Sequence, residues 1–239
     1  MSLNLFDPQV SIAADFGAGS GRWSVRMLDF FSKIYVIEPS IGAIEVLNQR
    51  FKNNEKIVIL KETISLNSVP DQSLDLAFSI GVLHHIQDTP SAIKQISSKI
   101  KSGGYFLCYL YYKLDEKPIV YRLLFFSSNL LRMLISKLPY NLKKLICSFL
   151  AAVIYLPLAR TSKLLKFFGF KVSNFPLHHY SDLSFEMMAN DSLDRFGTRL
   201  ERRFNKSEII EMLSKANFDL DTIKFSDEEP FWTFSVMKL

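Results

Sequence analysis

Short apolar runs and stretches of helical spacing alternate along most of the chain, and this alternation predicts the order of its elements. The apolar runs predict five strands, at residues 11–15, 33–38, 56–61, 74–79 and 105–112. Because helical stretches lie between them, the strands are expected to form a parallel sheet. A helix at 206–216 and two more strands, at 220–226 and 231–239, complete the pattern as a helix and a hairpin.

The helix before the fifth strand carries the clearest signals of where it begins and ends. Thr89 can cap its start, Pro90 suits its first turn, and Gly103 is expected to end it. His84 and His85 are therefore expected in a loop above the carboxyl edge of the sheet, where open α/β sheets bind their ligands.

Residues 113–205 form an insertion that the alternating pattern does not need, and we expect a helical cap. In its first helix Leu123, Leu131 and Leu134 fall on one face, and Arg132 and Ser136 fall on the opposite face. Further helices are predicted at 142–155 and 160–168, and a loop at 173–204. The predicted domains are a core at 1–112, the basic cap at 113–205, and a C-terminal part at 206–239 that completes the core sheet.

Composition and charge narrow the class of protein. The 239 residues are 48% apolar, which suits one domain with an insertion, and the formal net charge is +5. Residues 113–170 hold ten lysines and arginines against two acids, a net of +8, so the remainder carries −3. These charges alternate with leucine and phenylalanine, which argues against a nucleic-acid partner. Three interpretations stay open: an ordinary cap, a surface for a membrane or a lipid-linked acceptor, or a dimer face.

The sequence also bears on location. Cys108 and Cys147 are the only cysteines, both in apolar surroundings, and the N-terminus lacks a charged segment followed by an apolar one. We therefore expect a protein of the reducing cytoplasm, without a metal site. The apolar stretch 145–159 is shorter than the roughly 20 residues that span a bilayer, so any contact at the inner membrane surface is expected to be peripheral.

The most specific motif is D-F-G-A-G-S-G at residues 15–21, which follows the first apolar run. Its glycines let backbone N–H groups approach a ligand closely, because glycine has no Cβ. A dinucleotide site spaces its glycines as G-x-G-x-x-G, whereas Gly17, Gly19 and Gly21 are spaced G-x-G-x-G behind Asp15. The Asp15 carboxylate favours a ligand with a cationic amine over a pyrophosphate.

These residues resemble the class I S-adenosylmethionine (SAM) dependent methyltransferases, of the type 11-like kind. The segments at 70–75 and 77–88 look like that family's fourth strand and the loop after it, and Glu38 stands where the family places a ribose ligand. The resemblance covers roughly the first 110 residues and the C-terminal part. It implies a Rossmann-like, seven-stranded mixed sheet with the cap inserted after the fifth strand, a final antiparallel strand, and SAM as cofactor.

The resemblance also implies which residues hold SAM. In chain order they are Asp15, Gly17, Ala18, Gly19, Glu38, Pro39, Thr63, Ile64, Ser79, Ile80 and Gly81. Among them Glu38 would bind both ribose hydroxyls. Either Glu62 or Thr63 would contact the adenine amino group, and the sequence leaves this choice open.

Residues for the methyl acceptor are expected from the sheet edge and from the cap. Candidate bases are His84, His85 and His179, and candidate substrate contacts are Tyr111, Tyr180, Arg195 and Arg199. The two arginines could grip an anionic acceptor or pair with nearby acids, and both interpretations stay open.

The sequence as a whole predicts a SAM-dependent methyltransferase that methylates an oxygen atom of a small-molecule or lipid-linked acceptor. The alternative is a non-catalytic protein of the same fold that acts as a membrane or partner-binding module. A nicotinamide-dependent oxidoreductase is disfavoured by Asp15 and by the glycine spacing. The sequence predicts no oligomeric state.

Overall fold

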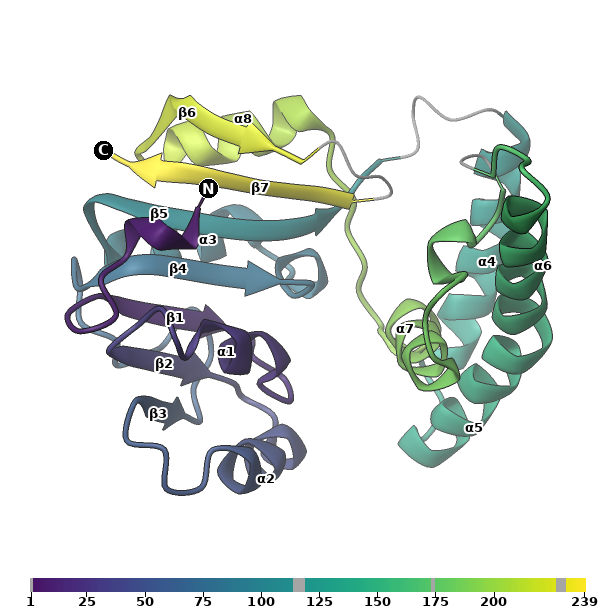
Figure 1. The fold of residues 1–239 in the computed structure, drawn as a ribbon, viewed down its shortest axis with the longest axis horizontal. Coiled ribbons are helices and arrows are strands. Elements are labelled where there is room, and N and C mark those ends of the chain that lie inside the picture. The colour runs from purple at the N-terminus through teal and green to yellow at the C-terminus, as the bar shows by residue number, and fades with distance from the viewer. Residues whose placement is uncertain (1, 114–118, 173–174, 227–230) are drawn as a thin grey trace. The chain divides into compact units, whose positions relative to one another are not determined.

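The structure is a computed structural model that describes residues 2–113, 119–172, 175–226 and 231–239. The chain forms two compact units (Figure 1), one of Met1–Lys113 with Glu201–Leu239 and the other of Leu114–Leu200. We call them the sheet unit and the helical unit. The helical unit ends before the expected boundary at 205, because Arg202 and Phe204 donate backbone hydrogen bonds to His84 and Tyr111 of the sheet unit (2.8 and 2.9 Å).

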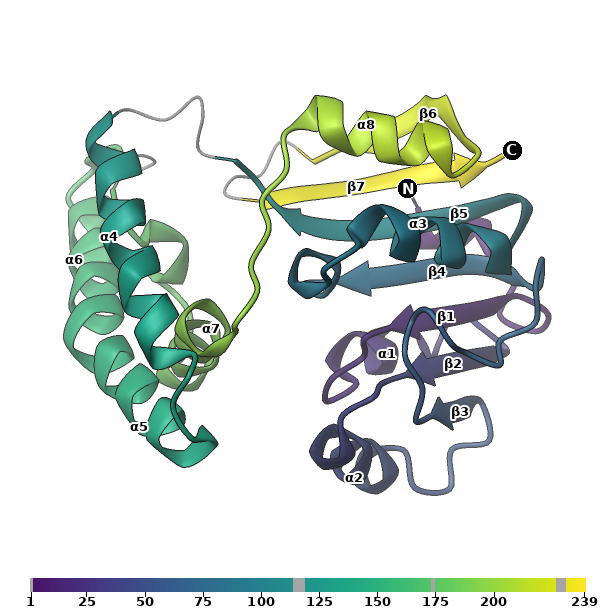
Figure 2. The same cartoon turned by 180° about the vertical axis from the view of Figure 1, so that it is seen from behind.

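A seven-stranded sheet of order β3-β2-β1-β4-β5-β7-β6 forms the sheet unit (Figures 1 and 2). Its strands are β1 (Ile12–Phe16), β2 (Lys33–Ile37), β3 (Ile57–Leu60), β4 (Leu74–Ile80), β5 (Ile100–Tyr111), β6 (Phe218–Phe225) and β7 (Phe231–Lys238). The first five are parallel, while β7 runs antiparallel to both β5 and β6. The predicted mixed sheet is confirmed, and its last strand lies inside the sheet.

Helices cover both faces of this sheet. α1 (Arg22–Met27) and α2 (Ile41–Arg50) contribute to one apolar cluster, and α3 (Thr89–Lys99) and α8 (Lys206–Lys215) to the other. Side chains alternate along a strand, so Ala13 enters the first cluster while Ala14 and Phe16 enter the second. The short helix η1 (Leu3–Leu5) precedes β1.

The limits of α3 differ from the prediction. Asp88, not Thr89, caps the helix by accepting a hydrogen bond from the Ser91 N–H (3.0 Å), while the Thr89 hydroxyl donates to the Leu83 carbonyl (2.9 Å). The helix ends at Lys99, and Gly103, with φ of +79°, makes a turn inside β5. The helix ends earlier because β5 begins at Ile100, which pairs with Leu74.

The helical unit contains α4 (Ile119–Ile135), α5 (Tyr140–Leu150), η3 (Ala151–Tyr155), α6 (Leu156–Phe167), η4 (His178–Tyr180) and α7 (Phe185–Gly197). α7 lies in the segment that was expected to be a loop, so that prediction is wrong. The Ser184 side chain caps α7, and Met188, Ser192 and Phe196 recur at four-residue spacing on its buried side. A serine within the buried stripe hides the helical period from sequence inspection.

α5, η3 and α6 form one continuous helix where two helices were expected. η3 is a π-helical turn that ends two residues before Pro157. Proline lacks an N–H, and its ring crowds the carbonyl four residues earlier, so a wider turn accommodates it without ending the helix. The resulting helix, Tyr140–Phe167, has 28 residues and is long and apolar enough to cross a membrane by length and composition alone.

Part of the polar face of α4 is buried while much of its apolar face is exposed. Arg132 and Ser136 are 8% and 3% exposed, whereas Leu123 and Leu134 are 60% and 68% exposed. The Arg132 guanidinium donates to Asn129 Oδ1 and to the carbonyls of residues 198 and 199 (2.8, 3.0 and 2.9 Å). These polar contacts, together with a Lys143 hydrogen bond to the Gly197 carbonyl (3.2 Å), attach the end of α7 to α4 and α5.

Candidate functional site

The glycine-rich turn between β1 and α1 forms a backbone cradle at the carboxyl edge of the sheet. Gly17 has φ of +82°, and a Cβ on it would lie 2.4 Å from a methyl carbon of Val82. Its N–H and that of Ala18 donate to the Ile37 carbonyl (2.9 and 3.2 Å), which joins the turn to β2. Glycine is therefore required at position 17 by both conformation and space.

Gly19 differs from Gly17 because its missing side chain faces open space. Its φ is +54°, and a Cβ there would meet no atom within 4 Å. Its N–H donates to Glu38 Oε2 (2.9 Å). The open side of Gly19 therefore leaves room for a ligand to lie against the backbone.

Glu38, directly after β2, is 8% exposed and is held by two backbone groups. Its Oε2 accepts from Gly19 and its Oε1 from the Ser40 N–H (2.9 Å each). A carboxylate oxygen can accept more than one hydrogen bond, so each oxygen keeps acceptor capacity. Glu38 is thus oriented to accept from two vicinal hydroxyls, as the ribose of SAM would present.

Asp15 is 2% exposed near the end of β1 and accepts a hydrogen bond from the Ser24 hydroxyl (2.6 Å). Burial, and secondarily the charge of Glu38, raises the pKa of Asp15 from 3.8 to about 7. A cation beside Asp15 would stabilise its ionised form and lower this pKa again. The residue is thus suited to a ligand that carries an ammonium or sulfonium group.

The end of β4 borders the same cradle. Ser79 is fully buried and its hydroxyl donates to the Phe16 carbonyl (2.8 Å), which ties β4 to β1. Ile80 and Gly81 are half-buried after it, and Gly81 has φ of +81° beside the Tyr109 ring. Pro39, on the opposite side of the cradle, is exposed.

The residues proposed to contact adenine differ in their exposure and in their hydrogen bonds. Thr63 is exposed, and Ile64 is 6% exposed within the core. The Glu62 carboxylate accepts from the Ser68 N–H and hydroxyl (2.7 and 2.9 Å), which holds the loop after β3. The Thr63 hydroxyl likewise accepts from the Leu66 N–H (3.2 Å), so both candidates for adenine take part in holding this loop.

An aromatic cluster lies at the carboxyl edge of β4 and β5. The His84 ring stacks on Tyr111 with centroids 3.8 Å apart, and the His85 ring lies 4.2 Å from His84. Tyr109 meets both His84 and Tyr111 edge-on, at 5.9 Å each. The structure therefore brings together His84, His85 and Tyr111, three of the residues predicted for the acceptor.

The two histidines of this cluster differ in what they can do. His84 is fully buried, and neither ring nitrogen makes a hydrogen bond within the described residues. Burial, with the charges of His85 and Arg203, lowers the pKa of His84 to about 2. A ring that stays neutral and inaccessible packs against Tyr111 and is a poor base, so half-buried His85 is the better candidate.

Glu201 and Arg203 belong to the same edge, and the sequence did not predict their role there. Arg203 Nε donates to Glu201 Oε1 (2.9 Å), and Nη1 donates to the Tyr112 carbonyl (3.1 Å). The guanidinium lies 5.0 Å from the centre of the Tyr111 ring. The only sequence signal was the concentration of arginines at 195–203, because the contact with β5 spans about 90 residues of chain.

The other predicted acceptor residues lie in the helical unit. Tyr180 is 8% exposed and packs against Tyr155, and the His179 ring lies 4.0 Å from Tyr180. Burial lowers the pKa of His179 to about 4. Arg195 donates to the Ser128 hydroxyl (2.9 Å) and lies over Phe125, while Arg199 is exposed.

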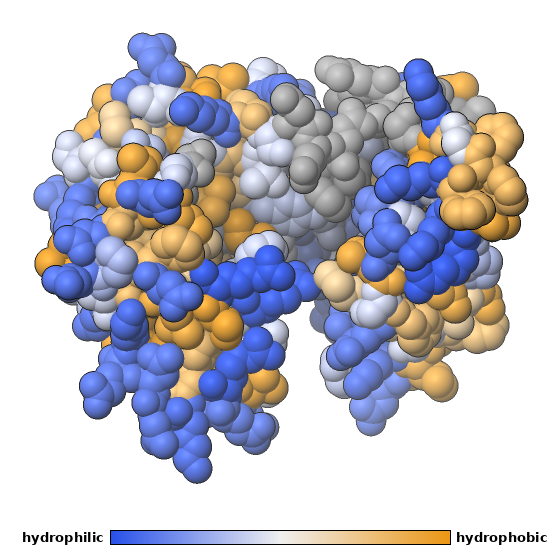
Figure 3. Space-filling view, in the orientation of Figure 1, coloured by the Kyte–Doolittle hydropathy of each residue, from blue (hydrophilic) through white to orange (hydrophobic). Residues whose placement is uncertain are grey.

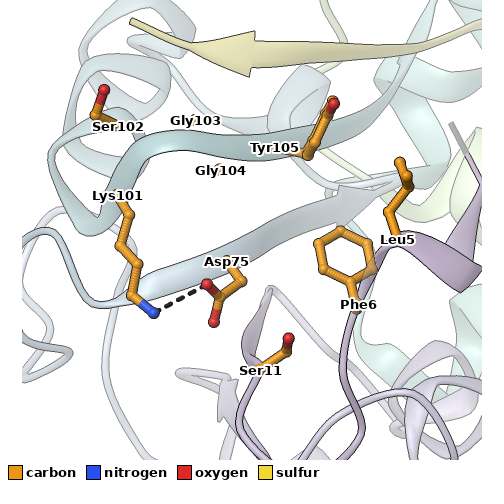
Figure 4. A pocket seen from close by; sticks show the side chains of 9 residues that line it. All are labelled: Leu5, Phe6, Ser11, Asp75, Lys101, Ser102, Gly103, Gly104 and Tyr105. Carbon is orange, nitrogen blue, oxygen red and sulfur yellow. Dashed lines mark hydrogen bonds and ion pairs between the residues drawn. The ribbon is translucent and has the colours of Figure 1, made fainter.

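A pocket of the sheet unit lies at the opposite, amino edge (Figure 4). Asp75 accepts from Lys101 Nζ and from the Ile12 N–H (2.9 and 2.7 Å). The Phe6 and Tyr105 rings line the same pocket. Since the Asp75 oxygens already join β1, β4 and β5, this pocket closes the sheet end and lies apart from the glycine cradle.

The sheet order, the reversed seventh strand and the cradle define the class I SAM-dependent methyltransferase fold. Residues 14–108, about two fifths of the chain, match the family model described as a methyltransferase domain. SAM is the cofactor of this family, and Asp15, Gly19 and Glu38 fit its cation and its ribose.

Curated relatives match part of the chain. It is 29% identical over 112 residues to a tRNA U34 carboxymethyltransferase of Campylobacter hominis, which covers 44% of this chain and 39% of that protein. The chain thus spans about two fifths of the length of the relatives it matches.

Solved structures agree with the fold over most of the chain. A protein from Bacillus halodurans C-125, assigned as a methyltransferase, superposes with a TM-score of 0.56 at 10% identity, covering 94% of this chain and 70% of that one. Human N-acetylserotonin methyltransferase in complex with SAM superposes with a TM-score of 0.53 at 16% identity, covering 99% of this chain and 50% of that one. At these identities the likeness concerns the fold alone.

Proposed function

We propose that the protein transfers the methyl group of SAM to a hydroxyl oxygen of a small-molecule or lipid-linked acceptor. The observation that carries this proposal is the cluster of one half-buried imidazole, His85, with the phenols of Tyr109 and Tyr111 at the strand ends beside the cradle. These groups are suited to bind a hydroxyl and to accept its proton.

The roles follow from the residues. When bound, SAM supplies an electrophilic methyl group on a sulfonium. Glu38 would hold the ribose, Asp15 would face the positive charge, and the open side of Gly19 would admit the cofactor. His85 would take the proton that the acceptor hydroxyl loses, while edge-to-face contacts with the His84 and Tyr111 rings hold its ring in place.

The test is a transfer assay with SAM labelled on the methyl group, offered to hydroxylated small molecules, to total lipid extract and to tRNA. His85→Gln should lower kcat by about 10²- to 10⁴-fold, the usual contribution of a general base, with the SAM Kd unchanged. His178→Gln makes the same change at a half-buried histidine of the helical unit, and it serves as the matched control that should leave kcat unchanged.

Other results would favour the alternatives. Label that enters tRNA alone would support a nucleic-acid acceptor, the class of acceptor in the name of the Campylobacter tRNA U34 carboxymethyltransferase, and would refute the present proposal. Tight SAM binding without transfer to any of the three would support the non-catalytic module. A His85→Gln variant with unchanged kcat would remove His85 from the reaction.

A further inference from the structure

α4 carries an unpartnered apolar stripe on its exposed side. The stripe recurs at three- or four-residue spacing along Ile119, Leu123, Phe126, Leu130, Met133 and Leu134, all at least 49% exposed. The buried side of the same helix holds Arg132 beside Ile135, and Ser136, directly after the helix, is buried as well. A helix in water normally places these two faces the other way round, so the exposed stripe indicates a less polar surrounding on that side.

The continuous helix Tyr140–Phe167 shows a second such stripe. Cys147, Ala151, Tyr155 and Ala159 form its buried side and pack in one cluster with Met188 and Phe196 of α7. The opposite side presents apolar side chains with large exposed fractions. They are Leu142, Leu145, Phe149, Val153, Leu164 and Phe167.

Charge identifies the kind of surface that such stripes would meet. Residues 119–172 contain nine lysines and arginines and no aspartate or glutamate. Arg122, Lys137, Lys144, Lys166 and Lys171 are exposed, and they make no ion pair within the described residues. Hydrophobic and hydrophilic residues both reach the visible surface of the helical unit (Figure 3). Bulky apolar side chains flanked by lysines are typical of helices that lie on anionic lipid.

We propose that the helical unit docks on the surface of an anionic lipid bilayer through the two apolar stripes of α4 and of Tyr140–Phe167. A second copy of the chain would bring another surface of the same positive charge against this one. A spanning arrangement conflicts with the charges, because the uncharged stretch 145–159 is about 22 Å long at 1.5 Å per residue, short of the hydrocarbon core of about 30 Å.

The buried side of the long helix also argues for docking over spanning. Ser192 of α7 donates to the Cys147 carbonyl (2.9 Å), and Lys143 donates to the Gly197 carbonyl (3.2 Å). Lipid around the whole helix would break these contacts and expose the polar side of α7. The inference rests on the helical unit and stands whether or not the acceptor is a hydroxyl.

Vesicle flotation with the full chain tests the proposal. The vesicles are phosphatidylcholine alone, or phosphatidylcholine and phosphatidylglycerol in a two-to-one mixture. The protein should float with the mixed vesicles, should do so less with phosphatidylcholine alone, and should be released by high salt or alkaline carbonate. Retention after carbonate treatment would show an integral span and overturn the surface model.

Two sets of variants separate the apolar and the electrostatic parts. Leu145→Gln with Phe149→Gln should lower the partition coefficient between vesicles and water at least about 100-fold. Burial of each of these apolar side chains contributes roughly 1.5 kcal/mol or more. Lys137→Gln, Lys144→Gln and Lys166→Gln together should lower it about 100-fold, since each basic residue contributes about 1 kcal/mol near an anionic surface. Circular dichroism would check that these exposed substitutions leave the helices intact.

Matched controls lie in the sheet unit. Val10→Gln with Leu66→Gln removes two exposed apolar residues, and Lys52→Gln, Lys94→Gln and Lys224→Gln remove three exposed charges. Both should float like the unmodified protein. Equal loss in test and control variants would overturn the assignment to the helical unit. If the unmodified protein does not float with either kind of vesicle, the lipid-docking proposal is overturned. A dimer seen in gel filtration that Leu145→Gln with Phe149→Gln converts to a monomer would then assign the stripes to a dimer face. RNA binding that the three lysine substitutions abolish would assign the basic surface to RNA.

Discussion

α8 of the sheet unit and α4 of the helical unit differ in how they place polar and apolar residues. In α8 the apolar side chains Ile209, Met212 and Leu213 are buried against the sheet, and the charged residues face water. In α4 an arginine is buried and leucines are exposed. The hydrophobic effect explains the first arrangement completely. In the second, the buried Arg132 is stabilised by hydrogen bonds to two carbonyls, and the exposed leucines form the stripe that we propose to dock on lipid.

The largest effect is expected at the cofactor cradle. Glu38→Ala removes the only group that accepts from both Gly19 and Ser40 among the described residues. Two charge-assisted hydrogen bonds to the ribose contribute about 1.5–3 kcal/mol each, so SAM affinity should fall at least about 100-fold. Titration calorimetry measures this. Glu62→Ala, which removes the matched acid after β3, should lower SAM affinity far less. Equal losses of SAM affinity in the two variants would refute the assignment of Glu38 to the ribose.

The next largest effect is expected in α4, where Arg132 is buried. Arg132→Met leaves the carbonyls of residues 198 and 199 without their donor and should lower the free energy of unfolding by about 3 kcal/mol. Leu134→Gln, on the exposed side of the same helix, should change it by less than about 0.5 kcal/mol. Urea unfolding compares the two. A larger loss for the leucine would mean that α4 buries its apolar face after all.

Two glycines of one turn should respond differently to the same added methyl group. Gly17→Ala meets Val82 and should lose about 1–3 kcal/mol more stability than Gly19→Ala, because only the first is overpacked. Both share the strain of a positive φ. Gly19→Ala should instead weaken SAM binding, since its new Cβ would enter the open side of the cradle. Thermal melting with and without SAM distinguishes these outcomes.

The smallest expected effect is a dependence on pH. With a pKa of about 7 for Asp15, the ionised fraction rises about tenfold from pH 6 to pH 8, and apparent SAM affinity should rise by the same factor. Asp15→Asn should bind SAM weakly at every pH. A flat profile for the unmodified protein would show that the cofactor does not require ionised Asp15.

The contribution of Asp15 to the free energy of unfolding should fall as pH rises, whereas SAM affinity should rise. The folded pKa of Asp15 lies above its ordinary value of 3.8, so the folded state holds the proton where the unfolded state has released it. The contribution of Asp15 is therefore fully present below about pH 4 and is lost as pH rises to about 7. Asp15→Asn should melt higher than the unmodified protein at pH 8, and this advantage should vanish at pH 4.

The sequence predicted the cradle because its signals are local. Gly17, Gly19 and Glu38 mark a turn and a strand end within a short stretch, and hydrophobic alternation orders the strands around them. It could not separate His84 from His85, because their difference is burial under Tyr111 and Arg203. Nor could it tell which face of α4 is buried, since that depends on carbonyls some 66 residues away.

The place of β7 between β5 and β6 has a consequence for biosynthesis. Residues 231–238 must leave the ribosome before β6 can join the sheet, because β6 reaches β5 only through β7. The helical unit is complete by residue 200. A nascent chain can therefore fold this unit, and on our proposal dock it on lipid, while the sheet that carries the cofactor cradle is still being translated.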